Sequence, residues 1–389
     1  WASFLSGYAS SFSQASVALT PALHSNIAEA FVQDNWKATP RLTLNLGVRY
    51  TYFQQPTDSN HLLDNFDASQ YKPANAPTLD TNGLICRSAS SACTGGVIPN
   101  PTYDPLNGII LATPGTNGHA SPYGSTIGKQ HNLNFAPRFG LAYDLFGDGK
   151  TVVRGGFGIG FDSTLFGTYE QNSFANPPYV VTTAYNNVRF DNPATGVPNV
   201  ASTPSPGALR GTATDFKTPY AEQYSFGIQQ QLATGLLLST DYVANHGVHL
   251  LGIVDVNEAV PGAYVTAGLG IAAGGVTSAN TAKLNLIRPY RGYNAINVVE
   301  NIFGSNYNSL QVQLQKRFRD ESLFDVNYTW SKALTDNQTD RSTAVQDRTN
   351  IRDEYGRSQI DRRHIFSADA IYRLPFFRQQ HGRVGHVLG

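Results

Sequence analysis

The sequence has few charged side chains and no surplus of either sign. Lys, Arg, Asp and Glu make up 14% of its 389 residues, against roughly 25% in ordinary soluble domains. The 28 basic residues balance the 28 acidic residues, which gives a formal net charge of +0. The chain therefore has no basic surplus to attract nucleic acid and no acidic tail, and we expect no nucleic-acid partner.

Long hydrophobic runs are also missing. No run approaches the ~18 apolar residues that a membrane-spanning helix needs, and short stretches such as Leu236–Leu238 are among the longest. A helical membrane protein is therefore excluded. A membrane β-barrel is not, because its strands alternate apolar and polar residues and average out to mild hydropathy.

Methionine does not occur at all, and the chain opens at Trp1 without the basic and then apolar leader of a signal peptide. We interpret the sequence as an internal part of a longer protein.

Cysteine occurs twice, at Cys86 and Cys93, with small polar residues between and glycine and proline around. A loop disulfide in an oxidising compartment is the favoured interpretation, and two unrelated free thiols are the alternative. A zinc site does not fit, because only His61 is near in sequence and the spacing matches no ligand pattern.

What the sequence does contain is strict two-residue alternation over long segments. In 42–53, the apolar side chains of Leu42, Leu44 and Leu46 alternate with Thr43 and Asn45, and the pattern continues. Successive side chains of a strand point to opposite faces, so one face is apolar and the other polar or small. Eight further segments alternate in the same way: 24–36, 133–145, 153–161, 223–229, 236–245, 309–317, 324–331 and 364–374.

The expected strands are about 9–13 residues long, whereas strands of soluble proteins cluster near 5–6. At a tilt near 40°, eleven residues rise roughly 28 Å, enough for the ~25 Å apolar band of an outer-membrane barrel. Trp36 before a short turn and Trp330, Tyr50 and Tyr52 at the other strand ends suit the two membrane interfaces.

Short and long connections alternate along the chain. The short ones are 37–41, 146–150, 233–235 and 319–321, and the long ones are 54–132, 162–222, 247–307 and 333–363. Loops of this length are rare in compact soluble domains. Short periplasmic turns and long outer loops are typical of outer-membrane barrels.

The predicted fold is therefore all-β: an antiparallel transmembrane β-barrel, present in part, with long extracellular loops. Residues 24–376 form the barrel, 1–23 stay unassigned, and 377–389 form a turn or a truncated end. A hairpin within 247–307 is expected where Ile296, Val298 and Ile302 alternate.

The two faces of these strands predict different surroundings. Leaving some forty large apolar groups in water would cost tens of kcal/mol at ~1.5–3 kcal/mol each, so we expect membrane lipid to cover them. A soluble β-sandwich is the alternative, but its strands are shorter. On the polar face, Arg49, Arg138, Arg154, Asp241 and Asp325 are the candidates for lumen-facing groups.

Several motifs resemble a known family. Residues 31–50 (FVQDNWKATPRLTLNLGVRY) resemble the strand–turn–strand signature of TonB-dependent receptors, and 135–144 (FAPRFGLAYD) look like a second barrel hairpin. Residues 306–314 (NYNSLQVQL), 328–332 (YTWSK) and 361–364 (DRRH) are similar to the Oar-like subfamily. The likeness covers about 24–376, with the long loops unmatched.

This resemblance implies a 22-stranded barrel in the outer membrane of a Gram-negative bacterium, a plug domain, and energy from the inner-membrane TonB complex. It implies uptake of a large ligand, such as a siderophore, a glycan or a peptide. Loops 54–132, 162–222 and 247–307 would capture it. A passive porin or a surface adhesion barrel is the alternative function.

Other candidate sites have simpler interpretations. Residues 155–160 alternate glycine with apolar residues and lack the dinucleotide fingerprint, so glycine on a crowded strand face is favoured. His246 and His249, at the start of a long loop, are a polar loop rather than a metal site. Segment 333–363 interleaves Asp with Arg, which favours mutual ion pairs over calcium. No nucleophile–base spacing stands out, so we expect no enzyme, cofactor or metal.

Overall fold

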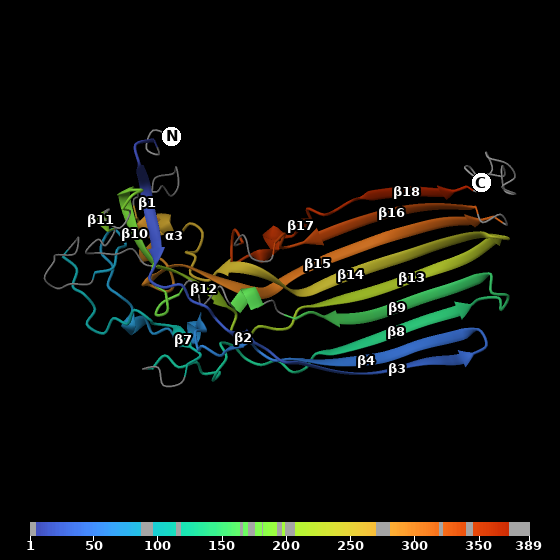
Figure 1. Ribbon diagram of the computed structural model, residues 1–389, viewed down its shortest axis with the longest axis horizontal. Coiled ribbons are helices and arrows are strands. Elements are labelled where there is room, and N and C mark those ends of the chain that lie inside the picture. The colour runs from blue at the N-terminus through green and yellow to red at the C-terminus, as the bar shows by residue number, and fades with distance from the viewer. Residues whose placement is uncertain are drawn as a thin grey trace, which may run out of the picture.

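A broad antiparallel sheet dominates the computed structural model, with a lobe of loops at one end (Figure 1). The structure describes residues 5–86, 96–113, 118–163, 166–169, 176–180, 182–192, 197–198, 207–269, 281–318, 322–339 and 345–372.

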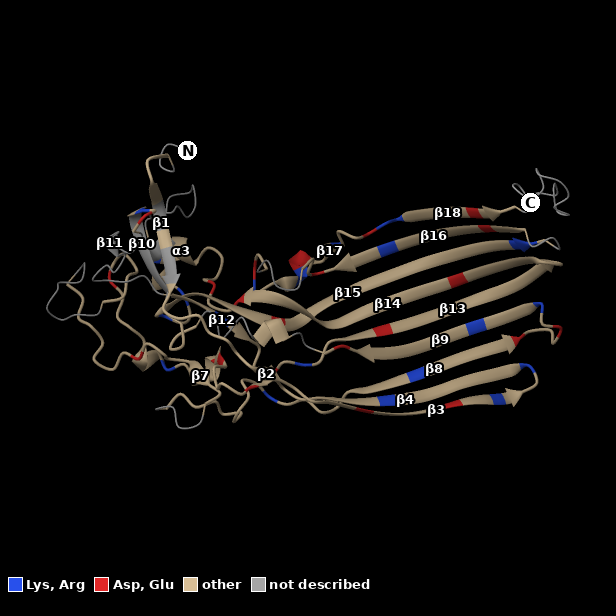
Figure 2. Ribbon diagram, in the orientation of Figure 1, with Lys and Arg blue, Asp and Glu red and all other residues tan. Residues whose placement is uncertain are grey.

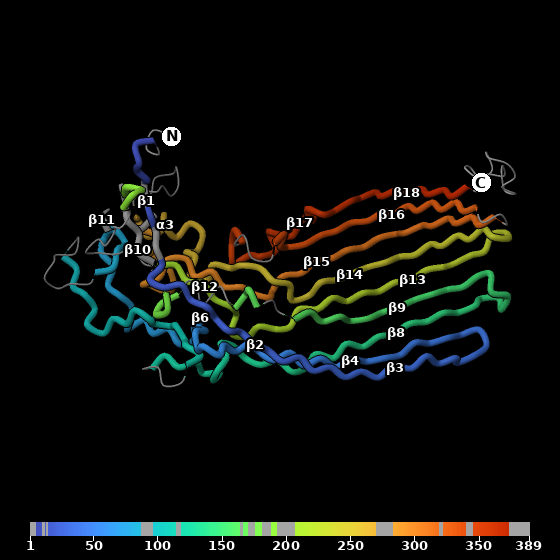
Figure 3. The backbone as a smooth tube through the Cα atoms, viewed as in Figure 1, coloured from blue at the N-terminus to red at the C-terminus, as the bar shows by residue number. Residues whose placement is uncertain are grey.

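Nine long strands follow one another across this sheet in chain order, as the sequence predicts. They are β3 (Ile27–Thr39), β4 (Leu42–Phe53), β8 (Phe135–Asp144), β9 (Thr151–Phe161), β13 (Tyr220–Ala233), β14 (Leu236–Asp255), β15 (Tyr293–Arg317), β16 (Leu323–Thr335) and β18 (His364–Ile371). Every neighbouring pair is antiparallel. The tube in Figure 3 shows the chain running to and fro, with short turns at one end only.

The remaining elements are short and belong to the loops. They are β1 (Tyr8–Ala15), β2 (Leu23–His24), β5 (Thr57–Asp58), β6 (Asp64–Phe66), η1 (Ala68–Gln70), η2 (Pro73–Asn75), β7 (Ile109–Leu111), β10 (Thr182–Arg189), β11 (Val197–Pro198), β12 (Gly207–Thr212), α3 (Ala263–Thr266), η4 (Thr281–Leu286), η5 (Ile351–Glu354) and β17 (Gly356–Arg357). Strand β1 lies in the segment that the sequence left unassigned and pairs with β10. No helix of the described residues is long and apolar enough to cross a membrane.

Two strands are longer than predicted, and this corrects the interpretation of 247–307 as a loop with its own hairpin. The β14–β15 ladder continues beyond the neighbouring strands until Asp255 pairs with Asn297. Register shifts near Gly247 and Gly252 allow the ladder to bend there. The predicted alternation at Ile296 and Val298 is therefore the start of β15 itself.

The sheet has one apolar face, and none of the residues that the structure describes forms a layer over it. Phe226 in the middle of β13 is 57% exposed, and Trp36 and Trp330 are 53% and 52% exposed. The clusters of buried apolar residues lie instead among the loops. Asp34 on the edge strand β3 is a charged residue on this otherwise apolar face, because it pairs with Leu46, whose side chain lies on the apolar face. Figure 2 shows that charged residues are sparse along the strands and frequent in the turns and the lobe.

One register row joins the two ends of the apolar face. It begins at Trp36 near the turn end of β3 and reaches Trp330 near the lobe end of β16, through Leu44, Leu141, Gly155, Phe226, Tyr242 and Leu310. With strands about 4.8 Å apart and tilted about 40°, such a row climbs roughly 20 Å along a barrel axis. That is close to the ~25 Å apolar band of a barrel, so the two tryptophans lie near its opposite borders.

A charge placed in the middle of the apolar face tests whether lipid covers it. Phe226→Arg is expected to lower the free energy of unfolding in lipid vesicles by about 2–4 kcal/mol, because it places a cation in hydrocarbon. Ser225→Arg is the matched control, since the adjacent residue points to the polar face. Denaturant titration measures both, and equal effects of the two substitutions would contradict a lipid-covered face.

Candidate functional site

The polar face of the sheet carries all five charged residues singled out in the sequence. Arg154 lies opposite Gly227, which lies opposite Asp241, so these three share one row. Arg138 pairs with Gly47, two residues from Arg49 on β4. Asp241 pairs with Gln311 on β15, and Asp325 pairs with Gln315 on the same strand. Gln311 and Gln315 are four residues apart, so their partners lie on the same face. The five residues therefore share a face but are spread over five strands. That this face borders a lumen stays a prediction.

These charges have polar partners on the same face. Arg49 Nη1 lies 3.5 Å from Glu29 Oε2. The carboxylate of Asp325 accepts hydrogen bonds from Gln313 Nε2 at 3.0 Å, Gln315 Nε2 at 3.2 Å and Asn327 Nδ2 at 3.0 Å. The charged groups of this face are therefore satisfied by polar side chains of the same face, as expected for the polar side of a barrel strand.

Glycines keep the centre of the polar face open. A concavity of about 1070 Å³ lies over the sheet from β3 to β15, and Gly47, Gly140, Gly156 and Gly158 line it together with Arg138. The glycine-rich segment 155–160 is thus part of a strand whose even-numbered glycines face the polar side, as the sequence predicts. The expectation that this face is crowded was wrong, because a Cβ at Gly156, Gly158 or Gly160 would meet no atom closer than 3.5 Å.

The three longest loops do not stand apart but share one hydrophobic core. Phe66 from loop 54–132, Leu209 from loop 162–222, and Ile296 from the β15 extension pack in a single buried cluster. Tyr71 and Tyr290 pack against it at its border, with ring centroids 5.1 Å apart. We call this assembly the loop lobe. Because its parts come from distant segments, no local sequence pattern marks it.

Three buried asparagines connect the segments of the loop lobe. Asn65 Nδ2 donates to the carbonyls of Ile127 at 3.1 Å and Thr212 at 2.7 Å. Asn176 Nδ2 donates to the Arg210 carbonyl at 2.6 Å, and its Oδ1 accepts from the Arg210 amide at 2.9 Å. A buried amide that satisfies backbone groups of another segment fixes the relative position of the two.

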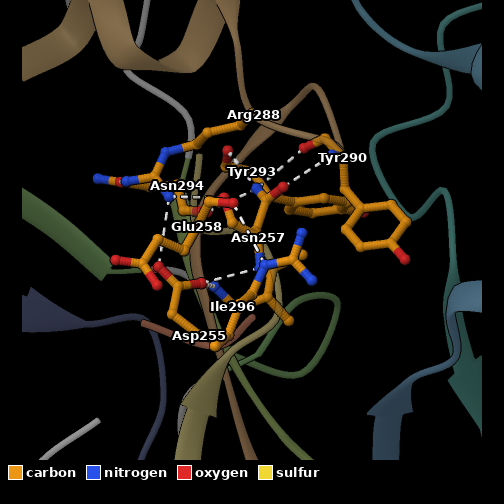
Figure 4. Close-up of polar contacts among 9 residues, drawn as sticks. Asp255, Asn257, Glu258, Arg288, Tyr290, Tyr293, Asn294 and Ile296 are labelled. Carbon is orange, nitrogen blue, oxygen red and sulfur yellow. Dashed lines mark hydrogen bonds and ion pairs between the residues drawn. The ribbon is translucent and has the colours of Figure 1, made fainter. Parts of the chain in front are cut away.

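Asn257 makes the densest of these contacts (Figure 4). Its Nδ2 donates to the carbonyls of Tyr290, Tyr293 and Asn294 at 3.0, 3.1 and 2.7 Å, and its Oδ1 accepts from the Tyr290 amide at 2.7 Å. Beside it, Arg288 Nη1 lies 3.3 Å from Asp255 Oδ2. The same network thus fastens the turn that follows β14 to the start of β15.

Asp64 is a fully buried carboxyl group in the loop lobe. Burial raises its pKa well above the ordinary value, although a hydrogen bond from Asn176 Nδ2 to Oδ1 at 2.7 Å acts in the opposite direction. Its Oδ2 has no hydrogen-bond partner in the described part of the chain. Desolvation disfavours the charged form, so this group favours the neutral acid.

Two cavities border the loop lobe. The first, about 300 Å³, opens where the lobe meets the sheet, and Ile27, Phe53, His131, Phe166 and Phe216 are among its walls. The second, about 530 Å³, lies at the seam between the first and third loops and is lined by Tyr71, Pro77, Pro99, Leu286 and Arg291, among others. We call them the mouth cavity and the seam cavity. The lining of the seam cavity combines several apolar side chains with one arginine, Arg291.

The other sequence candidates have separate outcomes. Cys93 lies outside the described residues, so its disulfide with the buried Cys86 stays a prediction. Residues 377–389 also lie outside them. His246 and His249 belong to strand β14 and not to a loop, which corrects that interpretation, and His246 Nδ1 lies 3.3 Å from Glu222 Oε2.

In segment 333–363, Arg357 Nη2 and Asp361 Oδ2 form an ion pair at 3.0 Å, in line with the favoured interpretation. Among the described residues no group of three or more His, Cys, Asp or Glu could hold a metal ion.

Comparisons place this architecture among known proteins. A family model described as an outer membrane beta barrel domain matches residues 1–389. A search of the curated proteins finds no match.

Three solved structures are similar to this chain at low identity. The outer membrane transporter YddB from Escherichia coli is 10% identical, with 80% of this chain and 25% of that chain covered and a TM-score of 0.39. The siderophore receptor PirA from Pseudomonas aeruginosa is 12% identical, with 79% and 34% covered and a TM-score of 0.35. The alcaligin outer membrane receptor FauA from Bordetella pertussis is 10% identical, with 91% and 35% covered and a TM-score of 0.38. The chain thus spans about a quarter to a third of their length.

Removing the Asn257 side chain tests whether it stabilises the loop lobe. Asn257→Ala is expected to destabilise the lobe by about 2–4 kcal/mol, because it leaves several buried backbone groups without partners. The exposed Asn82 provides the control, since Asn82→Ala should change stability by less than about 0.5 kcal/mol. Thermal proteolysis of the loops measures both, and an unchanged Asn257→Ala protein would argue against the network.

A pH series tests the buried carboxyl group. Because the pKa of folded Asp64 is raised, its contribution to stability is fully present below the pKa of the unfolded chain, about 4. That contribution is lost as pH rises through the folded-state value. Asp64→Asn should therefore leave lobe stability at pH 4 nearly unchanged and raise it at pH 8, measured by thermal proteolysis. Asp353→Asn, at an exposed carboxylate, should show no such dependence, and a parallel shift of both variants would refute the assignment.

Proposed function

Because the chain belongs to the outer membrane beta barrel domain family, we propose that it forms the barrel wall and outer loop lobe of a TonB-dependent receptor of the Oar-like type. The protein is located in the outer membrane of a Gram-negative bacterium. In this proposal it takes up a large ligand, such as a siderophore, a glycan or a peptide, with energy from the TonB complex. Ligand capture and transport, rather than catalysis, are its role.

The observation that carries this proposal is the shared core of the loop lobe. Phe66 and Leu209 come from two long loops and Ile296 from the lobe-side extension of β15, and all three are buried in one cluster. A ligand that binds a surface already folded does not have to order separate loops, and so it binds more tightly for the same contact area. A preformed loop surface favours ligand binding by a receptor, whereas diffusion through a simple open pore does not require one.

The seam cavity is the proposed capture site. Tyr71 and Leu286 supply apolar walls from two different loops, and Arg291 supplies a cation. Apolar walls with a few placed polar groups are the usual composition of ligand pockets. Two of the lining residues, Tyr71 and Arg291, are joined directly, because Tyr71 Oη donates to the Arg291 carbonyl at 2.9 Å.

The positions of the mouth cavity and of the glycine-lined concavity suggest a path from the loop lobe to the polar face of the sheet. The mouth cavity lies between the lobe and the first strands and includes Ile27 and Phe53, which pair at the lobe ends of β3 and β4. Ile27 pairs with Phe53, which is four residues from Arg49 on β4, so Ile27 lies on the same face as Arg49. A released ligand would pass from this mouth along the glycine-lined concavity once a plug moves aside.

Uptake by cells that carry the full-length protein tests the proposal. We expect one of three labelled probes, a ferric siderophore, a maltooligosaccharide or a peptide pool, to accumulate only while the inner membrane is energised. Dissipating the proton gradient should abolish accumulation and leave surface binding intact, because capture itself needs no energy. Arg291→Ala should weaken surface binding about tenfold, the effect of roughly 1.4 kcal/mol. Lys72→Ala, at an exposed cation outside the cavity lining, should leave binding unchanged.

Two outcomes would favour other functions. Steady ion conductance of the purified full-length protein in planar bilayers, without any energy source, would identify a passive porin. Surface attachment that depends on the loop lobe, with no energised uptake of any probe, would identify an adhesion barrel.

A further inference from the structure

Two hollows of the loop lobe share part of their lining. One is the seam cavity, and the other, about 590 Å³, is bordered by residues of the short helix α3 (Figure 1). We call the second one the helix hollow, and its lining includes Val260, Pro261, Ala263, Thr266 and Ile287. Leu286 and Arg291 line both hollows. The two spaces are therefore adjacent and form one elongated seat, with Arg291 at the border between them.

Most side chains along this seat are apolar. Ile98 in the seam cavity is 79% exposed, and Val260 in the helix hollow is 56% exposed. Exposed apolar side chains that gather at a hollow indicate a binding surface. The lining of the seam cavity also includes four prolines, Pro73, Pro77, Pro99 and Pro289. Such a lining favours apolar side groups over a glycan, whose many hydroxyl groups need hydrogen-bond partners when they are buried.

The border between the two hollows carries a positive charge. Arg291 is exposed and forms no ion pair with any residue that the structure describes. Neither Asp nor Glu is among the described residues that line the two hollows. Arg288 also lines the helix hollow, and although its Nη1 pairs with Asp255, its buried Nε has no hydrogen-bond partner in the described chain. A carboxylate at this border would find cationic donors and no competing acidic side chain.

We propose that the two hollows together bind an extended peptide. The carboxylate of an acidic peptide residue pairs with Arg291, and apolar side chains on either side of it occupy the seam cavity and the helix hollow. A compact metal chelate would fill one hollow, whereas a peptide chain advances about 3.3–3.6 Å per residue and can continue from one into the other. This inference rests on the proposed function, because the seam cavity is the proposed capture site, and it selects the peptide among the three ligand classes.

Fluorescence polarisation of the purified full-length protein in detergent tests the charge at the border. The probe is a dye-labelled peptide with blocked ends and a single glutamate between two pairs of leucines, and its counterpart carries glutamine instead. The glutamate peptide should bind about tenfold more tightly, because only its carboxylate forms a charge-assisted pair. Arg291→Ala should remove this preference, and Arg291→Lys should keep most of it. Both variants retain the backbone carbonyl of Arg291 that accepts from Tyr71.

The two apolar sides of the seat are tested separately. Ile98→Ser removes apolar contact in the seam cavity and Val260→Ser in the helix hollow, and each should weaken binding of the glutamate peptide about fivefold. Val17→Ser is the matched control, because Val17 is 45% exposed and lies outside both linings. It should bind as the unaltered protein does. A loss of affinity in Ile98→Ser alone would overturn the proposal, because the ligand would then occupy only the seam cavity.

The outcome can be distinguished from a failure of the transport function. No detectable binding of either peptide, equal binding of the two, or a glutamate preference that survives Arg291→Ala would each overturn the peptide assignment, even if cells take up a siderophore or an oligosaccharide. A glutamate preference that depends on Arg291 would support the assignment, even if no probe accumulates in energised cells.

Discussion

The contact between one face of the sheet and hydrocarbon is the constraint on which the rest of this structure depends. Phe226, Trp36 and Trp330 are all more than half exposed, and water would make such a surface costly at about 1.5–3 kcal/mol per large side chain. No element of the described chain covers this face. Membrane lipid covers this face without any further protein element. A lipid-covered face requires strands that are long enough to span a bilayer and that alternate strictly between apolar and polar residues.

The buried hydrophobic core of the described chain consequently lies at the lobe end of the sheet and not against a sheet face. In a soluble β-protein the inner faces of two sheets form the core, but here the buried clusters lie in the loop lobe. The loop lobe is in effect a small domain assembled from insertions between strands, and its stability has to come from Phe66, Leu209 and Ile296 and from buried amides such as Asn257. These contacts hold a seam cavity open and in place, which a ligand receptor requires.

The two faces of the sheet therefore differ in the surroundings that suit them. The polar face, with its glycines and the hydrogen-bonded Asp325, is suited to solutes in transit. The apolar face and the tryptophans at its two borders are suited to lipid. Because each strand alternates between the faces, a single sequence pattern specifies both, and a shift of one residue in register would exchange them.

The sequence by itself determined the nine strands, their order along the chain, and which residues share a face. A period of two is a local property, so Arg138, Arg154 and Asp241 could be assigned to one face from spacing alone. The extension of β14 and β15 into 247–307 was missed, since glycine-rich, irregular alternation resembles a loop until the partner strand is known. Only the tertiary structure decided that Phe66, Leu209 and Ile296 meet and that Asn65 and Asn257 join separate segments. Such contacts join residues far apart in the chain, and their free energy depends on burial and hydrogen-bond geometry that no local pattern records.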